Sequence, residues 1–259
     1  MKRQSKKPII VISPSNFPGT YGDTSNYLEI LNALKEKRLN VILFCPSHPQ
    51  SKAFDLVMRK RGIKTLRVPF RPIRLSDLKN HRLVFCIMRY LVFMMVETFT
   101  LLFAVIKYRP KVCLIRHDLL TFQIVPILSV LKIKSIADGE IRSYSIADAL
   151  KLPSYFMKIL FNYERRIIKH YTYYVCTNEQ QKRQAVLFGF PRNRIILRRV
   201  TIDTSKVPRY NIKQIPVATF GYFGTLEKWQ GVDILIRAFA KAVKKEPRIK
   251  LYIIGDGSM

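Results

Sequence analysis

A strand, a glycine turn, a helix and a second strand with its own glycine turn follow one another in the last part of the sequence. The first strand and turn lie in residues 220–233, and the second pair lies in residues 251–257. This order is typical of the opening βαβ unit of a nucleotide-binding parallel sheet. One βαβ unit cannot cover both faces of its own strands, so we expect the structure that begins near Val217 to be incomplete by itself.

The rest of the sequence alternates short apolar runs, typical of buried strands, with helical patterns. These runs are residues 8–13, 40–45, 63–68, 112–115, 135–137, 173–177 and 195–197. A polar stretch, residues 201–214, separates them from the last unit, with Pro208 inside it and Pro216 just after it. We therefore predict an α/β fold, with a Rossmann-like parallel sheet in residues 1–208 and the first βαβ unit of a second Rossmann-like domain in residues 209–259.

A loop with Gly19 and Gly22 follows the first predicted strand and leads into a helix. A helix that begins after such a loop presents free backbone N–H groups and the positive end of its dipole, which suits a phosphate. The Gly-x-x-Gly spacing fits a plain turn equally well. Both interpretations stay open at this point.

The chain is strongly basic, with 46 Lys and Arg against 17 Asp and Glu and a formal net charge of +29. Such a charge predicts attraction to a polyanion, which includes lipid headgroups, nucleic acid and phosphorylated substrates. The basic residues are scattered, and no zinc spacing, helix-turn-helix pattern or aromatic-glycine RNA signature accompanies them. A nucleic-acid-binding module is therefore the weaker interpretation.

The cysteines indicate neither a metal site nor a disulfide framework. Cys45, Cys86, Cys113 and Cys176 are far apart and form no C-x-x-C pair. Buried thiols in a reducing cytosol are the better interpretation. The apolar run after the basic start of the chain, residues 9–12, is too short for the core of a signal peptide. We expect a cytoplasmic protein without a zinc site.

One apolar run, residues 90–106, approaches the length of a membrane span but contains Glu97. A carboxylate in lipid is costly, so a buried or membrane-lying helix is favoured over a transmembrane one. The helical pattern that begins at Pro153 carries basic residues beside apolar ones, which fits either a solvated face or contact with anionic lipid on the inner side of the membrane. The candidate headgroup contacts are Arg71, Arg74, Arg165, Arg166 and Lys169.

Charged residues follow two of the predicted strands. Arg116, His117 and Asp118 follow one, and Asp138 and Glu140 follow the next. Open α/β sheets bind their ligands beyond the carboxyl ends of the strands, so these are candidate site residues. A helix cap or a surface histidine is the alternative for His117.

The sequence resembles the retaining glycosyltransferases of family 4, which have the GT-B arrangement of two Rossmann-like domains. The most specific matches are residues 221–239, which read Gly-Tyr-Phe-Gly-Thr-Leu-Glu-Lys-Trp-Gln-Gly-Val-Asp-Ile-Leu-Ile-Arg-Ala-Phe, and residues 254–257, which read Ile-Gly-Asp-Gly. They are similar to the signature that opens the family's donor domain. The Gly19 and Gly22 loop, and the helix of residues 164–173 before a strand that ends at Thr177, also match.

The resemblance implies transfer of a sugar from a nucleotide-diphosphate sugar to a glycan or lipid-linked acceptor in polysaccharide biosynthesis. The anomeric configuration would be retained, and neither a metal nor another cofactor would take part. His117, or its neighbour Arg116, would lie near the transferred sugar, and Asp138 and Glu140 would lie on the acceptor side. Glycine-loop amides and cations would stabilise charge on the leaving diphosphate. The implied donor-binding residues are Gly19, Gly22, Gly224, Lys228, Gly255 and Gly257.

The sequence departs from the family pattern at several positions. The hinge motif Asn-Gly-Val-Asp keeps only Asp203, and a basic residue that often follows the second-domain glycine is Thr225. The family's Glu-x7-Glu region, which contacts the donor, would lie beyond Met259. We expect a chain shortened within its donor domain and inactive alone. The alternatives are a subunit completed by a second polypeptide and a basic protein that binds membranes or nucleic acid.

Overall fold

The computed structural model describes residues 7–13, 22–69, 83–118, 121–139, 141, 154–198, 218–226 and 230–257. The chain divides into two compact units, Met1–Val200 and Thr201–Met259. Each unit is described by itself. The predicted domain boundary after residue 208 lies outside the described residues and stays a prediction.

The first unit alternates strands and helices as its apolar runs predict. Its strands are β1 (Ile9–Ile12), β2 (Val41–Pro46), β3 (Lys64–Val68), β4 (Val112–Arg116), β5 (Lys134–Asp138), β6 (Tyr173–Cys176) and β7 (Ile195–Leu197). Its helices are α1 (Gly22–Glu36), α2 (Ser51–Lys60), α3 (Leu83–Tyr108), α4 (Ile124–Val130), α6 (Ser154–Ile168) and α7 (Glu179–Leu187), with a 3-10 turn at Arg192–Arg194.

The seven strands form one parallel sheet in the order β3-β2-β1-β4-β5-β6-β7. This arrangement confirms the predicted Rossmann-like α/β fold. The strand order reverses between β1 and β4, where Ile10 lies opposite Ile42 on one side and Cys113 on the other. Such a reversal is the point at which open α/β sheets bind their ligands, beyond the carboxyl ends of the strands.

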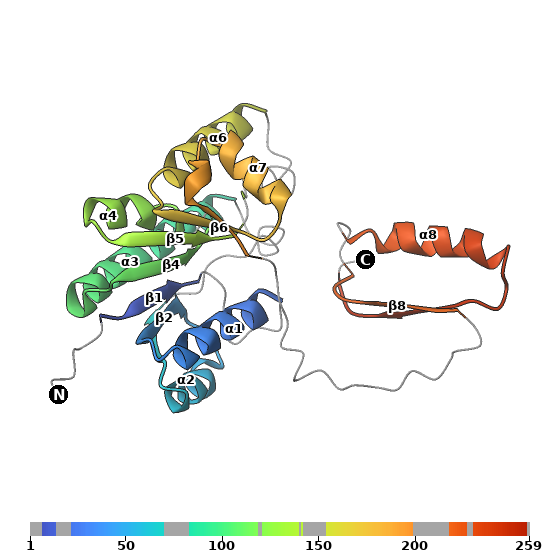
Figure 1. Cartoon of the computed structure of the whole chain (residues 1–259), viewed down its shortest axis with the longest axis horizontal. Coiled ribbons are helices and arrows are strands. Elements are labelled where there is room, and N and C mark those ends of the chain that lie inside the picture. The colour runs from blue at the N-terminus through green and yellow to red at the C-terminus, as the bar shows by residue number, and fades with distance from the viewer. Residues whose placement is uncertain are drawn as a thin grey trace. The chain divides into compact units, whose positions relative to one another are not determined.

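Side chains that alternate along the strands build a separate core on each face of the sheet. Val11 and Leu43 pack with Tyr27 and Leu31 of α1 on one face. On the other face, Ile10 and Ile12 belong to a larger cluster that includes α3, α4 and α6 residues. Figure 1 shows α1 and α2 beside β1 and β2, and α6 and α7 beside β6. Both faces of the central strands are therefore covered, as buried parallel strands require.

The second unit contains β8 (Thr219–Phe223), α8 (Val232–Val243) and β9 (Lys250–Ile254). The two strands are parallel, with Gly221 opposite Tyr252. The predicted βαβ unit is therefore present in this part of the chain. Of the hydrophobic residues described there, Val232 is buried. The apolar residues Phe220, Phe223, Ile234, Ile236, Tyr252 and Ile254 are between 49% and 86% exposed.

Candidate functional site

The candidate site residues of the first unit lie where β4 and β5 end, next to the reversal of strand order. Arg116 ends β4 and pairs in register with Asp138, which ends β5. The backbone N–H of His117 donates to the Asp138 carbonyl oxygen at 3.0 Å. These sequence-predicted residues are therefore brought together at one edge of the sheet, although 20 or more positions separate the two groups.

His117 lies in a closed pocket of side chains. Its Nε2 atom is 2.8 Å from Glu164 Oε1 of α6, and its Nδ1 atom is 3.2 Å from the Tyr171 hydroxyl. Neither the His117 nor the Glu164 side chain has exposed surface. One proton is shared across the Nε2–Oε1 contact, and the tautomer of the imidazole decides which of the two groups donates it. The expectation of a surface histidine is wrong, since the first unit encloses the ring completely.

Aromatic rings complete the enclosure of His117. The ring centroid of Phe122 lies 4.8 Å away, and those of Tyr174 and Tyr171 lie 5.5 Å and 5.6 Å away. Burial, and then the charge of Glu164, hold the pKa of Tyr171 well above its usual value, so its hydroxyl keeps its proton. A substrate could touch the imidazole only after these side chains move. The catalytic role of His117 stays a prediction.

Gly139 lets the ends of β4 and β5 approach each other. Its φ of +145° is rare for residues with a side chain, and a Cβ atom there would lie 3.3 Å from the His117 carbonyl oxygen. A hydrogen bond from Thr121 Oγ1 to the Arg116 carbonyl oxygen at 2.7 Å closes the turn after β4. The backbone around Arg116, Asp118 and Asp138 is therefore fixed by its own contacts.

Asp138 is buried, and one of its two carboxylate oxygens has a hydrogen-bond partner among the described residues. Its Oδ1 atom is 3.2 Å from Nη2 of Arg198, which follows β7. Its Oδ2 atom is buried and has no hydrogen-bond partner among the described residues. Buried polar atoms usually have a partner, so this oxygen can accept a hydrogen bond from water or from a ligand hydroxyl. The predicted acceptor-side neighbour Glu140 lies outside the described residues.

Glu97 is a second buried carboxyl group near this edge. It lies on α3 with 1% of its surface exposed, and Gln123 Nε2 donates to its Oε2 atom at 2.8 Å. Burial raises the pKa of Glu97 to about 8, and the negative charge of Asp118 adds to that rise. The carboxyl group therefore keeps its proton at neutral pH.

The thiols are enclosed by the first unit. Cys45, Cys113 and Cys176 are free and buried. Burial raises the pKa of Cys45 and Cys113 to about 12, so both stay protonated. Within the described ranges, no group of three or more His, Cys, Asp or Glu residues is arranged to hold a metal ion.

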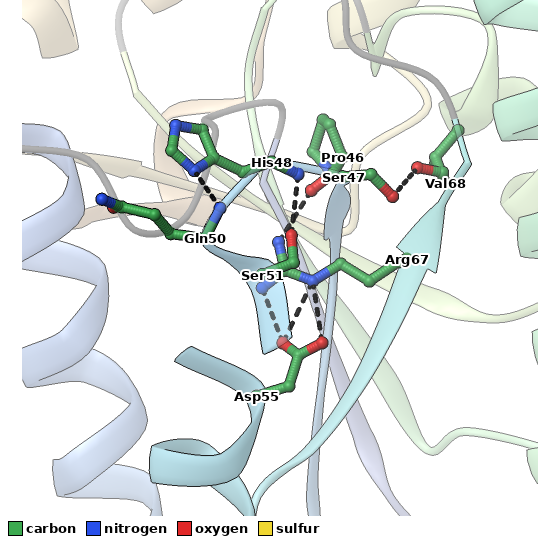
Figure 2. A network of polar contacts seen from close by, with 8 residues as sticks. All are labelled: Pro46, Ser47, His48, Gln50, Ser51, Asp55, Arg67 and Val68. Carbon is green, nitrogen blue, oxygen red and sulfur yellow. Dashed lines mark hydrogen bonds and ion pairs between the residues drawn. The ribbon is translucent and has the colours of Figure 1, made fainter. Parts of the chain in front are cut away.

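A separate polar network closes the ends of β2 and β3 (Figure 2). Arg67 Nη2 lies 2.6 Å from Asp55 Oδ1, and Arg67 Nη1 donates to the Pro46 carbonyl oxygen at 2.7 Å. Ser47 Oγ donates to the Val68 carbonyl oxygen at 2.8 Å. These contacts hold the strand ends to the start of α2, so we assign the network a structural role.

The glycines of the second unit have a packing role. Gly224 has a φ of +152°, and its N–H donates to the Ile254 carbonyl oxygen at 3.0 Å. A Cβ atom on Gly255 would collide with the Gly224 backbone, and one on Gly257 would collide with the backbone of Leu226. The two turns are therefore held too close for side chains. Donor binding by these glycines stays a prediction.

Of the remaining predicted site residues, some belong to the described part of the chain and others do not. Gly22 is the first residue of α1. Arg165, Arg166 and Lys169 are exposed. Gly19, Arg71, Arg74, Glu140 and Lys228 lie outside the described residues.

Three residues of the site were missed by the sequence analysis as site residues: Glu164, Tyr171 and Arg198. The only signal for Glu164 is an acidic residue three positions before the apolar Ile167, on the side of a helix that otherwise faces the core. Nothing in the local sequence links Arg198 with Asp138.

The fold of this chain is also found in solved structures of other proteins. The sequence matches no protein-family profile and no curated protein. The structure is similar to HepE of Anabaena, solved in complex with UDP, with a TM-score of 0.61 and 11% identity over 97% of this chain and 62% of HepE. The chain therefore spans less than two thirds of the length of this relative. Its fold is the GT-B glycosyltransferase fold.

Two further structures extend the similarity. A glycosyltransferase from Rickettsia africae matches with a TM-score of 0.58 and 12% identity, over 96% of this chain and 69% of its own. The UDP-GlcNAc 2-epimerase from Neisseria meningitidis, bound to UDP-GlcNAc, matches with a TM-score of 0.53 and 11% identity, over 96% of this chain and 66% of its own. The fold is thus shared by proteins of two activities.

Proposed function

We propose that this chain contains the acceptor-side domain and the opening of the donor domain of a retaining family 4 glycosyltransferase. Its donor is a nucleotide-diphosphate sugar, and its acceptor is a glycan or a lipid-linked glycan. The observation that supports this proposal most is the match to HepE, which covers 97% of this chain in the UDP complex and 96% in the UDP-glucose complex. The signature of residues 221–239 supports the family assignment.

The proposed mechanism needs charge stabilisation at the leaving diphosphate. The candidate groups of the first unit are the Arg116 cation and the backbone N–H groups of Gly19 and Gly22, and the family resemblance adds Gly224 and Lys228 as candidates. Preorganised donors of this kind stabilise charge that develops in the transition state without reorganisation. No metal is required for this step. Gly255 and Gly257 complete the proposed donor-side turns.

The acceptor hydroxyl is proposed to meet Asp138 and Glu140. The Oδ2 atom of Asp138, which has no hydrogen-bond partner among the described residues, supports this role, because a carboxylate oxygen can accept the proton of a hydroxyl group. His117 is proposed to act by positioning the turn that carries Arg116, since its own ring is enclosed. Arg198 orients Asp138 through the other carboxylate oxygen.

Turnover is proposed to require further polypeptide around β8 and β9. The support is the exposure of apolar residues on both strands, with Phe223 at 86% and Ile254 at 69%. A separately encoded polypeptide or a longer chain would serve equally. The chain by itself is expected to bind UDP weakly and to transfer no sugar.

The test compares donor binding with transfer. UDP binding to the purified chain is measured by calorimetry, and transfer from radiolabelled UDP-glucose to a membrane lipid extract is measured with and without the candidate completing polypeptide. In the completed enzyme, we expect Asp138→Asn to lower transfer by about 10² to 10⁴ with little change in UDP binding. Arg192→Ala is the control, because this exposed residue lies in the 3-10 turn before β7, away from the carboxyl ends of the strands.

The product decides between the two activities that share the fold. Sugar transferred to an acceptor with retained configuration supports the proposal. Conversion of UDP-GlcNAc to its 2-epimer without any acceptor, followed by NMR, would overturn it in favour of an epimerase. Robust transfer by the chain alone would contradict the need for further polypeptide.

A further inference from the structure

α3 has two apolar faces. On its inner face, Phe93, Leu101 and Ala104 are 1% exposed and belong to the core beneath the sheet. Its opposite side carries apolar residues that are between 38% and 72% exposed, and their spacing of three or four places them along one stripe. This outer face of α3 consists of Phe85, Met88, Leu91, Val92, Met95, Phe99, Phe103 and Ile106.

Cations, and no exposed acidic groups, lie on this helix. Arg89 and Lys107 are exposed near its two ends, and Lys107 Nζ lies over the Phe103 ring at 5.3 Å from its centroid. Glu97 is the acidic residue of α3, and it is buried on the inner face. The outer face is therefore apolar with a positive border.

α6 lies on the same face of the sheet as α3, because Ile167 and Phe93 belong to one core cluster. Phe156 and Ile159 of α6 are 56% and 48% exposed, next to the exposed Lys158. Burial raises the pKa of Tyr90 on α3, and the proximity of Asp118 and of Tyr163 on α6 adds to that rise, so the two helices approach each other. α6 thus adds a second apolar and basic surface on this side of the unit.

A membrane-spanning role does not fit these contacts. Among the helices of the described residues, one segment is long and apolar enough to cross a bilayer, namely Met88–Tyr108 of α3. Crossing would remove Phe93 and Leu101 from the core and would place Glu97 in hydrocarbon without Gln123. The inner face instead keeps α3 on the sheet, which leaves only the outer face available for contact.

A second copy of the chain also fits poorly. Paired helices select each other by opposite charges beside the apolar seam, and here the charges beside it are Arg89 and Lys107. Two copies would bring these cations together, and each copy carries a formal charge of +29. The sign of the charge matches an anionic lipid surface instead.

We propose that the outer face of α3 docks the first unit on an anionic membrane, with the helix axis parallel to the surface. The apolar stripe enters the boundary between headgroups and acyl chains, and Arg89 and Lys107 contact anionic headgroups. Phe156, Ile159 and Lys158 of α6 extend the contact. This inference goes beyond the proposed sugar transfer and does not depend on it.

The test uses the full chain and vesicles of phosphatidylcholine with about one third phosphatidylglycerol, assayed by co-sedimentation. We expect binding that weakens when salt is raised from about 0.1 M to 0.5 M, because headgroup attraction is screened. Phe99→Ser combined with Phe103→Ser should lower the partition coefficient at least about tenfold, since both rings lose their burial in the membrane. Arg89→Gln and Lys107→Gln should each lower it about fivefold.

The matched control is Leu56→Ser combined with Val57→Ser. These residues are 55% and 45% exposed on α2, which covers the other face of the sheet, so this variant should bind vesicles like the unchanged chain. An unchanged urea unfolding midpoint shows that each variant is folded. All the substituted side chains are exposed, so none should unfold the core.

Four outcomes would overturn the docking surface. The first is a failure of the unchanged chain to bind anionic vesicles, and the second is equal binding by the α3 and α2 variants. The third is a dimer in sedimentation equilibrium that the α3 variant abolishes, which would assign the outer face to a second copy. Resistance to extraction from membranes by alkaline carbonate would instead assign α3 to a span.

Discussion

The two units use the same βαβ construction and differ in what covers it. In the first unit, β1 lies between two neighbouring strands and has helices on both faces, and Ile10, Val11 and Ile12 have no exposed surface. In the described part of the second unit, β8 and β9 pair with each other and with no other strand, and Phe220 and Tyr252 are more than half exposed. The comparison shows that a correct local pattern forms elements, while stability depends on the layers that cover them.

Hydrogen exchange should show the largest difference between the units. Amides of β1 and β4 should exchange at least about a thousandfold more slowly than amides of β8 and β9, which corresponds to about 4 kcal/mol of opening free energy. Exchange of the full chain, resolved by peptide and mass spectrometry, measures this. Equal protection of the four strands would show that the second unit is stabilised by contacts not described above.

Core truncation should sharpen the same comparison. Phe93→Ala removes a ring that is 1% exposed in the first unit, and it should lower the free energy of unfolding by about 3 to 5 kcal/mol. Ile234→Ala on α8, where the side chain is 63% exposed, should change it by no more than about 0.5 kcal/mol. Urea unfolding followed by circular dichroism gives both values. A large effect of Ile234→Ala would show that this side chain of α8 is buried in the folded chain, which contradicts its exposure in the structure.

Ion pairs of the two units should differ in the same direction. Glu164→Gln replaces the carboxyl group in the fully buried contact with His117 and should cost about 1 to 3 kcal/mol. Asp233→Asn, in the exposed pair with Arg237 on α8, should cost about 0.3 to 0.5 kcal/mol. Denaturant unfolding of both variants makes the comparison. If Glu164→Gln were neutral, the buried contact would have no net stabilising role.

The buried Glu97 should make the first unit less stable as pH rises. Its pKa is raised in the folded state from 4.5 to about 8, so the folded chain binds one proton more than the unfolded chain between these values. The free energy of unfolding should therefore fall by up to about 1.4 kcal/mol per pH unit from about pH 5 to pH 8. The stabilisation is fully present below pH 4.5 and is lost through pH 8.

Glu97→Gln is the control for that pH dependence. An amide keeps the hydrogen-bonding shape of the protonated carboxyl group and does not titrate, so the fall in stability across this range should largely disappear. Unfolding midpoints at several pH values compare the two chains. The same slope in both would assign the pH dependence to other groups.

Local pattern predicted much of the fold, because strand and helix periodicity and the glycine turns are short-range signals. The run of residues 8–13 and the Gly224 turn belong to elements that the structure contains. The position of the candidate site was also predictable, since strand ends such as Arg116 meet at one edge of any parallel sheet.

The partners within the site could not be predicted, because they depend on tertiary contacts. Glu164 and Tyr171 meet His117 across 47 and 54 positions, and Arg198 meets Asp138 across 60. The sequence of α3 likewise cannot tell its inner face from its outer one, because both are apolar. Only the packing of Phe93 and Leu101 against the sheet distinguishes them.

The position of β1 has a consequence for synthesis of the chain. β1 leaves the ribosome before β4, and Ile10 lies opposite Cys113 of β4, so one edge of β1 waits for about a hundred more residues. At about 5 to 20 residues per second, that edge stays open for roughly 5 to 20 seconds. An open apolar edge is a site of aggregation, and a chaperone that binds the nascent chain should therefore contact residues near β1 during this interval.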